Sequence, residues 1–183
     1  MSKLKSNSLI IEKINSKHIN QGWLQWVNDN SINKNLNSKQ GGYTKKQLLA
    51  YIKKVKKRKE IMFAVRIKNN NEYLGNIKLN NIDYINKNCG YGLMMGNKKY
   101  AGYNYGILML YKISEYAFNK LKMKKIFSPV FADNYSSIIT HLKFGMKISG
   151  FFQNHFKKNK EFKDVFYFEL KKDDFKKIKK KYN

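Results

Sequence analysis

The sequence contains one cysteine and one proline among its 183 residues. A single cysteine excludes a disulfide within the chain, which favours a reducing compartment. No apolar run approaches the roughly 20 residues of a membrane-spanning helix, and the N-terminus lacks the apolar core of a signal peptide. No group of Cys, His, Asp or Glu has the spacing of metal ligands. We therefore expect a soluble, cytoplasmic protein with no metal ion and no membrane partner.

Arginine is nearly missing although the chain is strongly basic. Arg58 and Arg66 are the only arginines among 38 basic residues, and the net charge is +26. Base edges and bidentate phosphate contacts favour arginine over lysine. The lysines are also spread along the whole chain together with abundant asparagine, a pairing that codon bias can produce. The pattern therefore argues against nucleic acid as the partner and favours an anionic small ligand.

The residues that are present predict one folded domain. Hydrophobic residues make up 42% of the chain and aromatic residues 15%, which is enough for a core. Hydrophobic periodicity predicts strands at 9–14, 61–67, 73–82, 89–95, 125–131, 146–156 and 165–170, and helices at 16–27, 44–58, 107–121 and 134–145. Ser16 and Thr44 are suited to cap the first two helices, and Gly145 to end the last.

A glycine-containing turn at residues 100–106 precedes the third predicted helix. Gly102 and Gly106 flank Asn104 in this turn. The first N–H groups of a helix lack partners within the helix, and the helix dipole favours an anion there, so the turn can hold phosphate. One strand later, Asn134 gives the next helix a polar start. The order and spacing of the two features make the prediction more specific than a lone glycine turn would.

Four segments resemble the GNAT family of N-acyltransferases, in its RimJ/RimL-like branch. Residues 26–29 resemble the Trp-x-Asn-Asp signature, 74–79 the Ile-Gly-x-Ile strand, 101–106 the pyrophosphate loop, and 134–145 the Asn-x-x-Ser…Lys-x-Gly segment. The resemblance covers about residues 9–171. It implies an α/β GNAT fold in a single domain, with a mixed central sheet of about seven strands flanked by about four helices. Residues 172–183 would form a basic tail.

The resemblance implies acetyl-CoA as the acyl donor and an amine that attacks the thioester directly. The implied cofactor-binding residues are Leu93, Met94, Met95, Gly102, Tyr103, Asn104, Tyr105, Gly106, Asn134, Ser137 and Lys143. The strand residues in this set would also donate N–H groups to the developing oxyanion. Ala101 and Asn104 depart from the family's Arg or Gln and Gly. Because the loop binds through main-chain N–H groups and Asn tolerates positive φ, we expect the loop to keep its shape. Lys98 and Lys99 could supply the missing charge.

Two residues are candidates for proton transfer. His141 takes the position at which the family often has a tyrosine that protonates the departing thiolate. An imidazolium could donate that proton, since a reference pKa near ~6.5 suits an acid or a base; the alternative is that His141 only packs beside the cofactor. Asp83 is the acidic candidate for the base, with a solvated turn residue as the alternative. The candidate acceptor-binding residues are Trp26, Asn28, Lys78 and Tyr91, although Trp26 could equally be core and Tyr91 could act with a water chain as the base.

Three hypotheses remain open for the function, and two of them name an acceptor. So basic a protein should repel spermidine-like polycations and attract an anionic acceptor. Residues 74–79 resemble relatives that acetylate nucleotide-linked amino sugars in surface-polysaccharide pathways, which is the first hypothesis. The others are N-terminal acetylation of a protein, and a non-catalytic nucleic-acid or ribosome-binding module on the same fold. The oligomeric state is open between a monomer and a homodimer.

Overall fold

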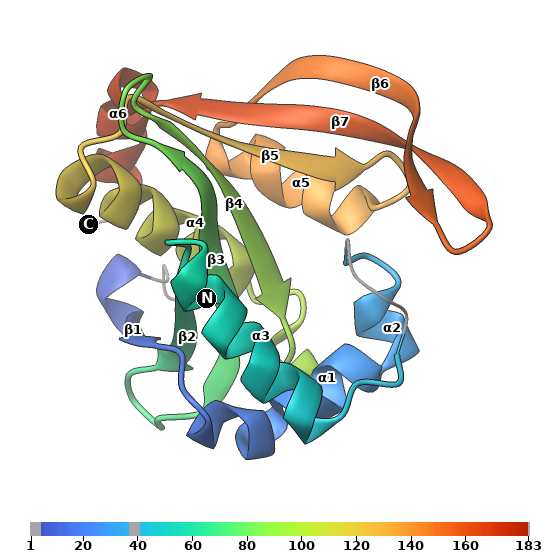
Figure 1. Cartoon of the computed structure of the whole chain (residues 1–183). Helices are drawn as coiled ribbons and strands as arrows, with labels where there is room; N and C mark the ends of the chain where they lie inside the picture. The colour runs from blue at the N-terminus through green and yellow to red at the C-terminus, as the bar shows by residue number, and fades with distance from the viewer. Residues whose placement is uncertain (1–4, 37–40, 183) are drawn as a thin grey trace.

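A computed structural model describes residues 5–36 and 41–182 (Figure 1). Seven strands form one sheet in the order β1-β2-β3-β4-β5-β7-β6. The strands are β1 (Leu9–Lys13), β2 (Ile61–Ile67), β3 (Tyr73–Asp83), β4 (Asn88–Met95), β5 (Lys125–Phe131), β6 (Lys147–Lys158) and β7 (Glu161–Lys171). β4 and β5 pair in parallel and every other neighbouring pair is antiparallel. The predicted mixed, seven-stranded sheet is thus confirmed.

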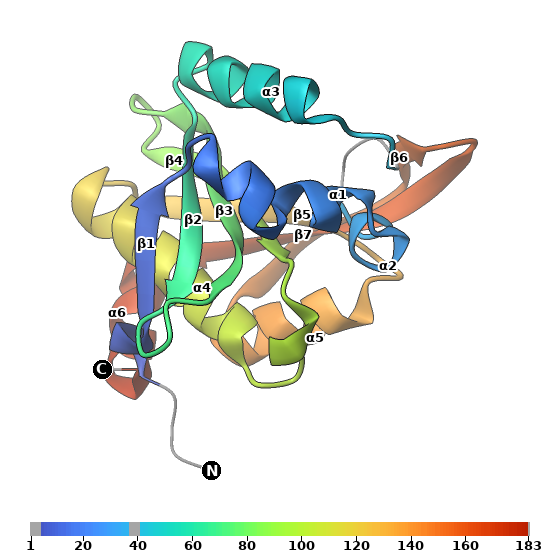
Figure 2. The same cartoon turned by 90° about the horizontal axis from the view of Figure 1, so that it is seen from below.

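Helices cover both faces of the sheet. The α-helices are α1 (Leu24–Asn28), α2 (Asn30–Asn33), α3 (Lys45–Lys57), α4 (Tyr105–Glu115), α5 (Tyr135–Phe144) and α6 (Lys172–Tyr182). Short 3₁₀ or π turns are η1 (Ser6–Ser8), η2 (Ile19–Trp23), η3 (Lys98–Tyr100) and η4 (Tyr116–Lys120). Figure 2 shows α3 on one side of the sheet and α4 and α5 on the other. Among the described residues, no helix combines the length and apolar composition needed to cross a membrane.

The sheet separates two apolar clusters. The larger cluster contains Tyr111, Phe118 and Phe168 and lies on the side of α4 and α5. The smaller cluster contains Trp26 and Leu48 and lies on the side of α1 and α3.

Local capping signals decide several helix ends as predicted. The Thr44 side chain accepts a hydrogen bond from the Gln47 N–H, and the Gln47 side chain accepts one from the Thr44 N–H. This reciprocal capping box begins α3. Gly145 has φ 102° and ends α5, in the left-handed conformation that glycine adopts without strain.

The predicted helix at 16–27 forms, but it is interrupted at Gly22. Gly22 has φ 136°, so the chain forms η2 and the short α1 instead. A Cβ atom at Gly22 would lie 2.7 Å from Trp26 Cζ2, so the missing side chain lets the Trp26 ring pack there. Ser16 does not cap with its side chain; its carbonyl oxygen accepts a hydrogen bond from the Ile19 N–H.

The C-terminal segment is also more ordered than predicted. Residues Lys172–Tyr182 form α6, whose Phe175 and Tyr182 are buried. Their rings lie 5.3 Å and 6.0 Å from the Tyr111 ring of α4. The many lysines made this segment look like a basic tail in the sequence, although it is an amphipathic helix. Its buried aromatic side chains belong to the core.

Candidate active site

Strands β4 and β5 separate partway along their length. They pair only at Asn88 with Lys125, Cys89 with Ile126, and Gly90 with Phe127. One residue further, the Ser128 hydroxyl donates to the Tyr91 carbonyl oxygen at 3.1 Å. Beyond that bond, β4 continues beside β3 alone. The result is a slot between two neighbouring strands, opening toward their C-terminal ends.

Backbone alternation decides which groups of β4 face the slot. The Tyr91 carbonyl points toward β5, and the β3–β4 register is regular from residue 90 to residue 95. Successive residues of a strand direct their N–H and C=O groups to opposite sides. Leu93 and Met95 therefore present these groups to the slot. Met94 instead pairs with Asn76 of β3, and its side chain is buried in the cluster that contains Trp26.

The turn before α4 gathers unpaired N–H groups. Gly102 and Asn104 have φ of 82° and 62°, both left-handed. Within the described chain, the N–H groups of Gly102, Asn104, Tyr105 and Gly106 have no hydrogen-bond acceptor. The Tyr103 N–H differs, because it donates to the Tyr100 carbonyl. Four open donors at a helix N-terminus fit a phosphate or pyrophosphate group.

Helix α5 lies beside this turn. A Cβ atom at Gly106 would be 3.4 Å from Thr140 Cγ2, so the start of α4 contacts α5. Lys143 follows Thr140 by three residues and therefore lies on the same side of α5, where it is exposed. Asn134 has a structural contact, because its side chain accepts the Ser137 N–H at 3.2 Å and caps α5.

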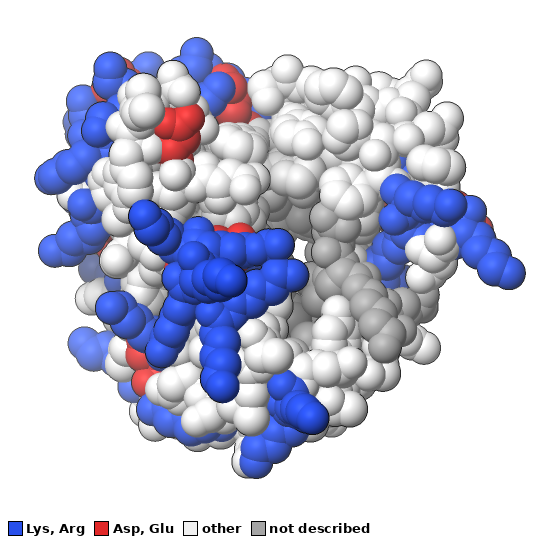
Figure 3. Space-filling view, in the orientation of Figure 1, with Lys and Arg blue, Asp and Glu red and all other residues white. Residues whose placement is uncertain are grey.

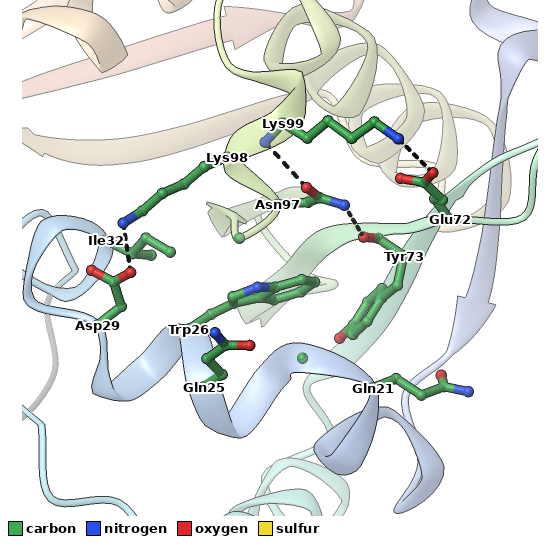
Figure 4. Close-up of a pocket in the computed structure, with 12 residues that line it drawn as sticks. Gln21, Gln25, Trp26, Asp29, Ile32, Glu72, Tyr73, Asn97, Lys98 and Lys99 are labelled. Carbon is green, nitrogen blue, oxygen red and sulfur yellow. Dashed lines mark hydrogen bonds and ion pairs between the residues drawn. The ribbon is translucent and has the colours of Figure 1, made fainter.

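Lys98 and Lys99 do not add charge to the turn, contrary to our prediction. Lys98 pairs with Asp29 of the α1–α2 junction at 2.6 Å, and Lys99 pairs with Glu72 at 2.8 Å. Both ion pairs border a pocket of about 490 Å³ on the α1 side of β4 (Figure 4). The lysine next to Asp29 lowers the pKa of that carboxyl to about 2.

Trp26 forms a wall of this pocket and is also core. Its side chain is buried, and its ring centroid lies 4.6 Å from that of Tyr73. Gly96 makes the fit possible, since a Cβ atom there would lie 2.0 Å from the indole. Asn28 does not line this pocket and instead has a structural contact. Its side chain bonds to both the N–H and the carbonyl of Tyr43, which ties α1 to the residues before α3.

His141 lies beside the slot in the larger apolar cluster. Its ring is stacked with that of Tyr91 at 5.9 Å and contacts Phe168 at 4.9 Å. Nδ1 is 2.6 Å from the Ser137 carbonyl oxygen, and because that oxygen only accepts, Nδ1 carries the proton. Nε2 is therefore a lone-pair acceptor. It is buried and has no partner among the described residues.

Burial also settles the charge of this imidazole. It lowers the pKa of His141 from 6.5 to about 4, although the hydrogen bond to Ser137 acts in the opposite direction. The ring is therefore neutral at pH 7, with an acceptor at Nε2. The imidazolium donor that we considered from the sequence does not match this environment. The Tyr91 hydroxyl donates to Met146 Sδ at 2.9 Å, and burial holds its pKa well above the usual value.

Asp83 is fully engaged in the β3–β4 turn. Its carboxylate accepts hydrogen bonds from the N–H groups of Ile85 and Asn86 and from the Asn86 side chain, at 2.7–2.9 Å. The Asn86 hydrogen bonds lower its pKa. The turn also lies beyond the closed end of the slot, where Asn88 still pairs with Lys125. The geometry supports the turn alternative, and we do not retain Asp83 as the base.

Lys78 of β3 has two partners that the sequence analysis missed. Its ammonium group donates to the Tyr51 hydroxyl at 2.9 Å and to Glu60 at 3.1 Å. Lys78 lies opposite Gly92 of β4, where the slot has already opened. The signal in the sequence was a lysine in an otherwise buried strand, because a buried ammonium requires an acceptor. Tyr51 belongs to α3 and Glu60 directly precedes β2, so sequence spacing could not identify them as the partners.

Every acidic side chain of the protein is occupied. Ten of the twelve acidic residues form ion pairs at 2.6–3.9 Å. The other two, Asp83 and Asp164, accept hydrogen bonds from backbone N–H groups. Within the described ranges, no three His, Cys, Asp or Glu side chains are grouped to hold a metal ion.

Comparisons with known proteins agree with this geometry. A sequence model of the family described as "Acetyltransferase (GNAT) domain" matches residues 8–147. Spermidine N-acetyltransferase from Vibrio cholerae, solved with CoA and spermine, superposes with a TM-score of 0.82 at 16% identity, covering 92% of this chain and 98% of that one. A GNAT-family acetyltransferase from Bacillus anthracis has a TM-score of 0.79 at 20% identity, covering 93% and 98%. No curated protein matches the sequence significantly.

Proposed function

The chain belongs to the GNAT acetyltransferase family, and from that premise we propose that it acetylates an amine acceptor that carries negative charge. As a family member it is an acyl-CoA-dependent N-acetyltransferase, with acetyl-CoA as the acyl donor. A nucleotide-linked amino sugar is our first candidate for the acceptor, because it joins an amine to a pyrophosphate.

The state of the acidic side chains is the main support for an acceptor with negative charge. A polyamine binds through carboxylates, and only twelve acidic side chains stand against 38 basic ones here, each with an ion-pair or hydrogen-bond partner within the protein. The net charge of +26 adds long-range repulsion toward a polycation and attraction toward an anion. The likeness to the Vibrio cholerae spermidine enzyme is a likeness of fold at 16% identity. It does not by itself argue for a polyamine acceptor here.

A second candidate is the N-terminal amine of a protein, as in the RimJ/RimL-like branch that residues 26–29 resemble. Figure 3 shows lysine side chains gathered over α3. An open acceptor groove would favour an extended chain, whereas a sugar nucleotide needs groups that surround it. The two candidates differ in size and are separated by the assay below.

The site residues support defined parts of the transfer. The four open N–H groups at residues 102–106 would hold the pyrophosphate of acetyl-CoA, with Lys143 adding charge. The slot-facing N–H groups of Leu93 and Met95 would bind the donor and the developing oxyanion. During transfer the acceptor nitrogen bonds to the acetyl carbon, the carbon–sulfur bond breaks, and the proton that the nitrogen loses passes to the departing thiolate, directly or through water. The neutral Nε2 of His141 would accept a hydrogen bond from the donor.

The acceptor is tested by thiol release from acetyl-CoA with four classes of amine. They are nucleotide-linked amino sugars, free amino sugars, ribosomal-protein N-terminal peptides and polyamines. We expect the highest kcat/KM with the first class and a decrease as salt rises, because charge attraction is screened. Highest turnover with polyamines would contradict the anionic acceptor, and highest turnover with peptides would select the second candidate.

Donor binding is tested separately at the turn. Gly106→Val places a branched side chain against Thr140 of α5 at the start of α4 and so displaces the turn that carries the open N–H groups; the Kd for acetyl-CoA should rise at least about tenfold in calorimetry. Ala50→Val is the matched control, since Ala50 is exposed on α3 across the sheet. An unchanged Kd for Gly106→Val would show that the pyrophosphate binds elsewhere.

A further inference from the structure

A hollow of about 550 Å³ lies at the end of the sheet where β5 begins and β7 ends. Five lysines line it, namely Lys122, Lys124, Lys125, Lys171 and Lys172. In Figure 1 the start of β5, the end of β7 and α6 meet at one corner of the molecule. We call this feature the lysine hollow. Its volume falls within the range of small-molecule binding sites, about 300–1,000 Å³.

Backbone pairing fixes these lysines beside one another. Lys125 is the first residue of β5 and Lys171 the last of β7, and the two form an antiparallel pair. Directly paired residues point to the same side of a sheet. One step further along both segments, the Lys172 N–H donates to the Lys124 carbonyl oxygen at 2.9 Å. Met123 is buried and supplies apolar lining. The fold, and not the sequence order alone, therefore brings the five lysines together.

Few carboxylates compensate these charges. Glu169 is shared, since it lies 3.6 Å from the Lys125 ammonium and 3.9 Å from that of Lys171. Asp173 also lines the hollow, but its carboxylate bonds to Lys176 at 2.8 Å and attracts Lys172 only at longer range. In the part of the chain that the structure describes, three lining lysines form no ion pair, namely Lys122, Lys124 and Lys172. Cations thus outnumber carboxylates five to two around one space.

The shape of the hollow makes these charges act together. Ammonium groups that line one space repel one another, and their fields add inside it. The lysines of α3 differ, because they are exposed on a helix surface where water surrounds each charge (Figure 3). An anion with several charges would offset the repulsion among several lysines of the hollow at once. An anion with a single charge would offset much less of it.

We propose that the lysine hollow binds a small molecule that carries two or more linked phosphate groups. A lysine ammonium group binds phosphate oxygens as a point charge and does not need the planar geometry of arginine. Linked phosphates place several negative charges within the volume of the hollow, which matches a lining of five lysines. A nucleoside triphosphate and a short inorganic polyphosphate share this chemistry, and the experiment below separates them.

The lysine hollow is distinct from the turn that precedes α4. Helix α4 continues directly into η4, and the helical residues from Tyr105 to Lys120 span roughly 24 Å. The open N–H groups of the turn lie at the first end of this span. Lys122 follows the other end by two residues. Phosphates of acetyl-CoA held at the turn and a ligand in the hollow therefore do not compete.

Calorimetric titration of the nuclease-treated protein, with CoA present in excess, tests the class of ligand. The probes are inorganic tripolyphosphate, ATP, orthophosphate and adenosine. We expect one saturable site for tripolyphosphate and for ATP, with a Kd at least about tenfold higher for orthophosphate. Tighter binding of ATP than of tripolyphosphate would identify a nucleotide as the ligand, and equal or weaker binding of ATP would identify the phosphate chain. Orthophosphate that binds as tightly as tripolyphosphate, adenosine that binds without phosphate, or no saturable site would overturn the proposal.

Two triple variants of equal charge separate the hollow from the basic surface as a whole. The hollow variant combines Lys122→Gln, Lys124→Gln and Lys172→Gln, and its Kd for tripolyphosphate should rise at least about tenfold. The matched control combines three substitutions on the exposed surface of α3, Lys53→Gln, Lys54→Gln and Lys57→Gln, and should keep the Kd within about twofold. Circular dichroism establishes that both variants are folded. Equal losses in the two variants would show that net charge binds the ligand, which would overturn the proposal.

Thermal unfolding gives an independent readout of the same site. A ligand that binds only the folded protein raises the Tm in proportion to its occupancy. Tripolyphosphate should therefore raise the Tm of the wild type and of the α3 control, and should have little effect on the hollow variant. A hollow variant that keeps the full increase in Tm would place the ligand elsewhere and overturn the proposal.

Discussion

Replacing His141 by phenylalanine should change how stability depends on pH. The buried imidazole is neutral, and its pKa is lowered from 6.5 to about 4. Below pH 6.5 a histidine in the unfolded chain binds a proton, whereas folded His141 does so only near pH 4. The unfolded state therefore binds more protons in this window, and stability falls as the pH is lowered through it.

The size of this change in unfolding free energy follows from the two pKa values of His141, in the unfolded and the folded chain. Each pKa unit corresponds to about 1.4 kcal/mol, so the interval from 6.5 to about 4 is worth about 3 kcal/mol. The loss begins below pH 6.5 and is complete near pH 4. Phenylalanine keeps a ring between Tyr91 and Phe168 and does not titrate. Carboxyl groups also titrate in this range, but both proteins contain the same ones and their contribution cancels in the difference.

The assay is urea unfolding of both proteins at several pH values from 7.5 to 4, analysed by linear extrapolation. We expect the difference in unfolding free energy between wild type and His141→Phe to shift by about 3 kcal/mol in favour of the variant as the pH falls. A difference that stays constant with pH would refute the neutral, buried imidazole. NMR titration of the His141 ring protons gives the pKa directly and should place it near 4.

Three further predictions concern the slot and its strands. Because a Cβ atom at Gly75 would lie 2.0 Å from the Met94 carbonyl oxygen, Gly75→Ala should lower the free energy of unfolding by about 1–3 kcal/mol in denaturant titrations. Gly92→Ala in the adjacent strand, where nothing lies within 4 Å, should cost far less, and equal losses would contradict the clash. Asp83→Asn should keep kcat within about twofold, whereas a hundredfold loss would return Asp83 to the mechanism as the base. His141→Phe removes the Nε2 acceptor and should raise the Kd for acetyl-CoA, and an unchanged Kd would remove His141 from donor binding.

The sequence alone determined the features that depend on neighbouring residues. The capping box at Thr44, the left-handed Gly145 and the glycine turn before α4 follow from backbone chemistry within a few residues. The order of strands and helices was sufficient to identify the sheet, because hydrophobic periodicity is a local signal. The same local signals failed at Gly22, where the indole of Trp26 rather than helix propensity decided the conformation.

Only the tertiary structure decided the state of the site residues. The neutral imidazole of His141 on α5 depends on burial against Tyr91 of β4 and Phe168 of β7, which are distant in the sequence. Lys98 and Lys99 follow one another in the sequence, yet they pair with acids from separate elements. Long-range contacts set burial and ion pairing, and these set pKa and charge. Sequence spacing could therefore place a residue near the slot, and only the fold could show which proton it carries.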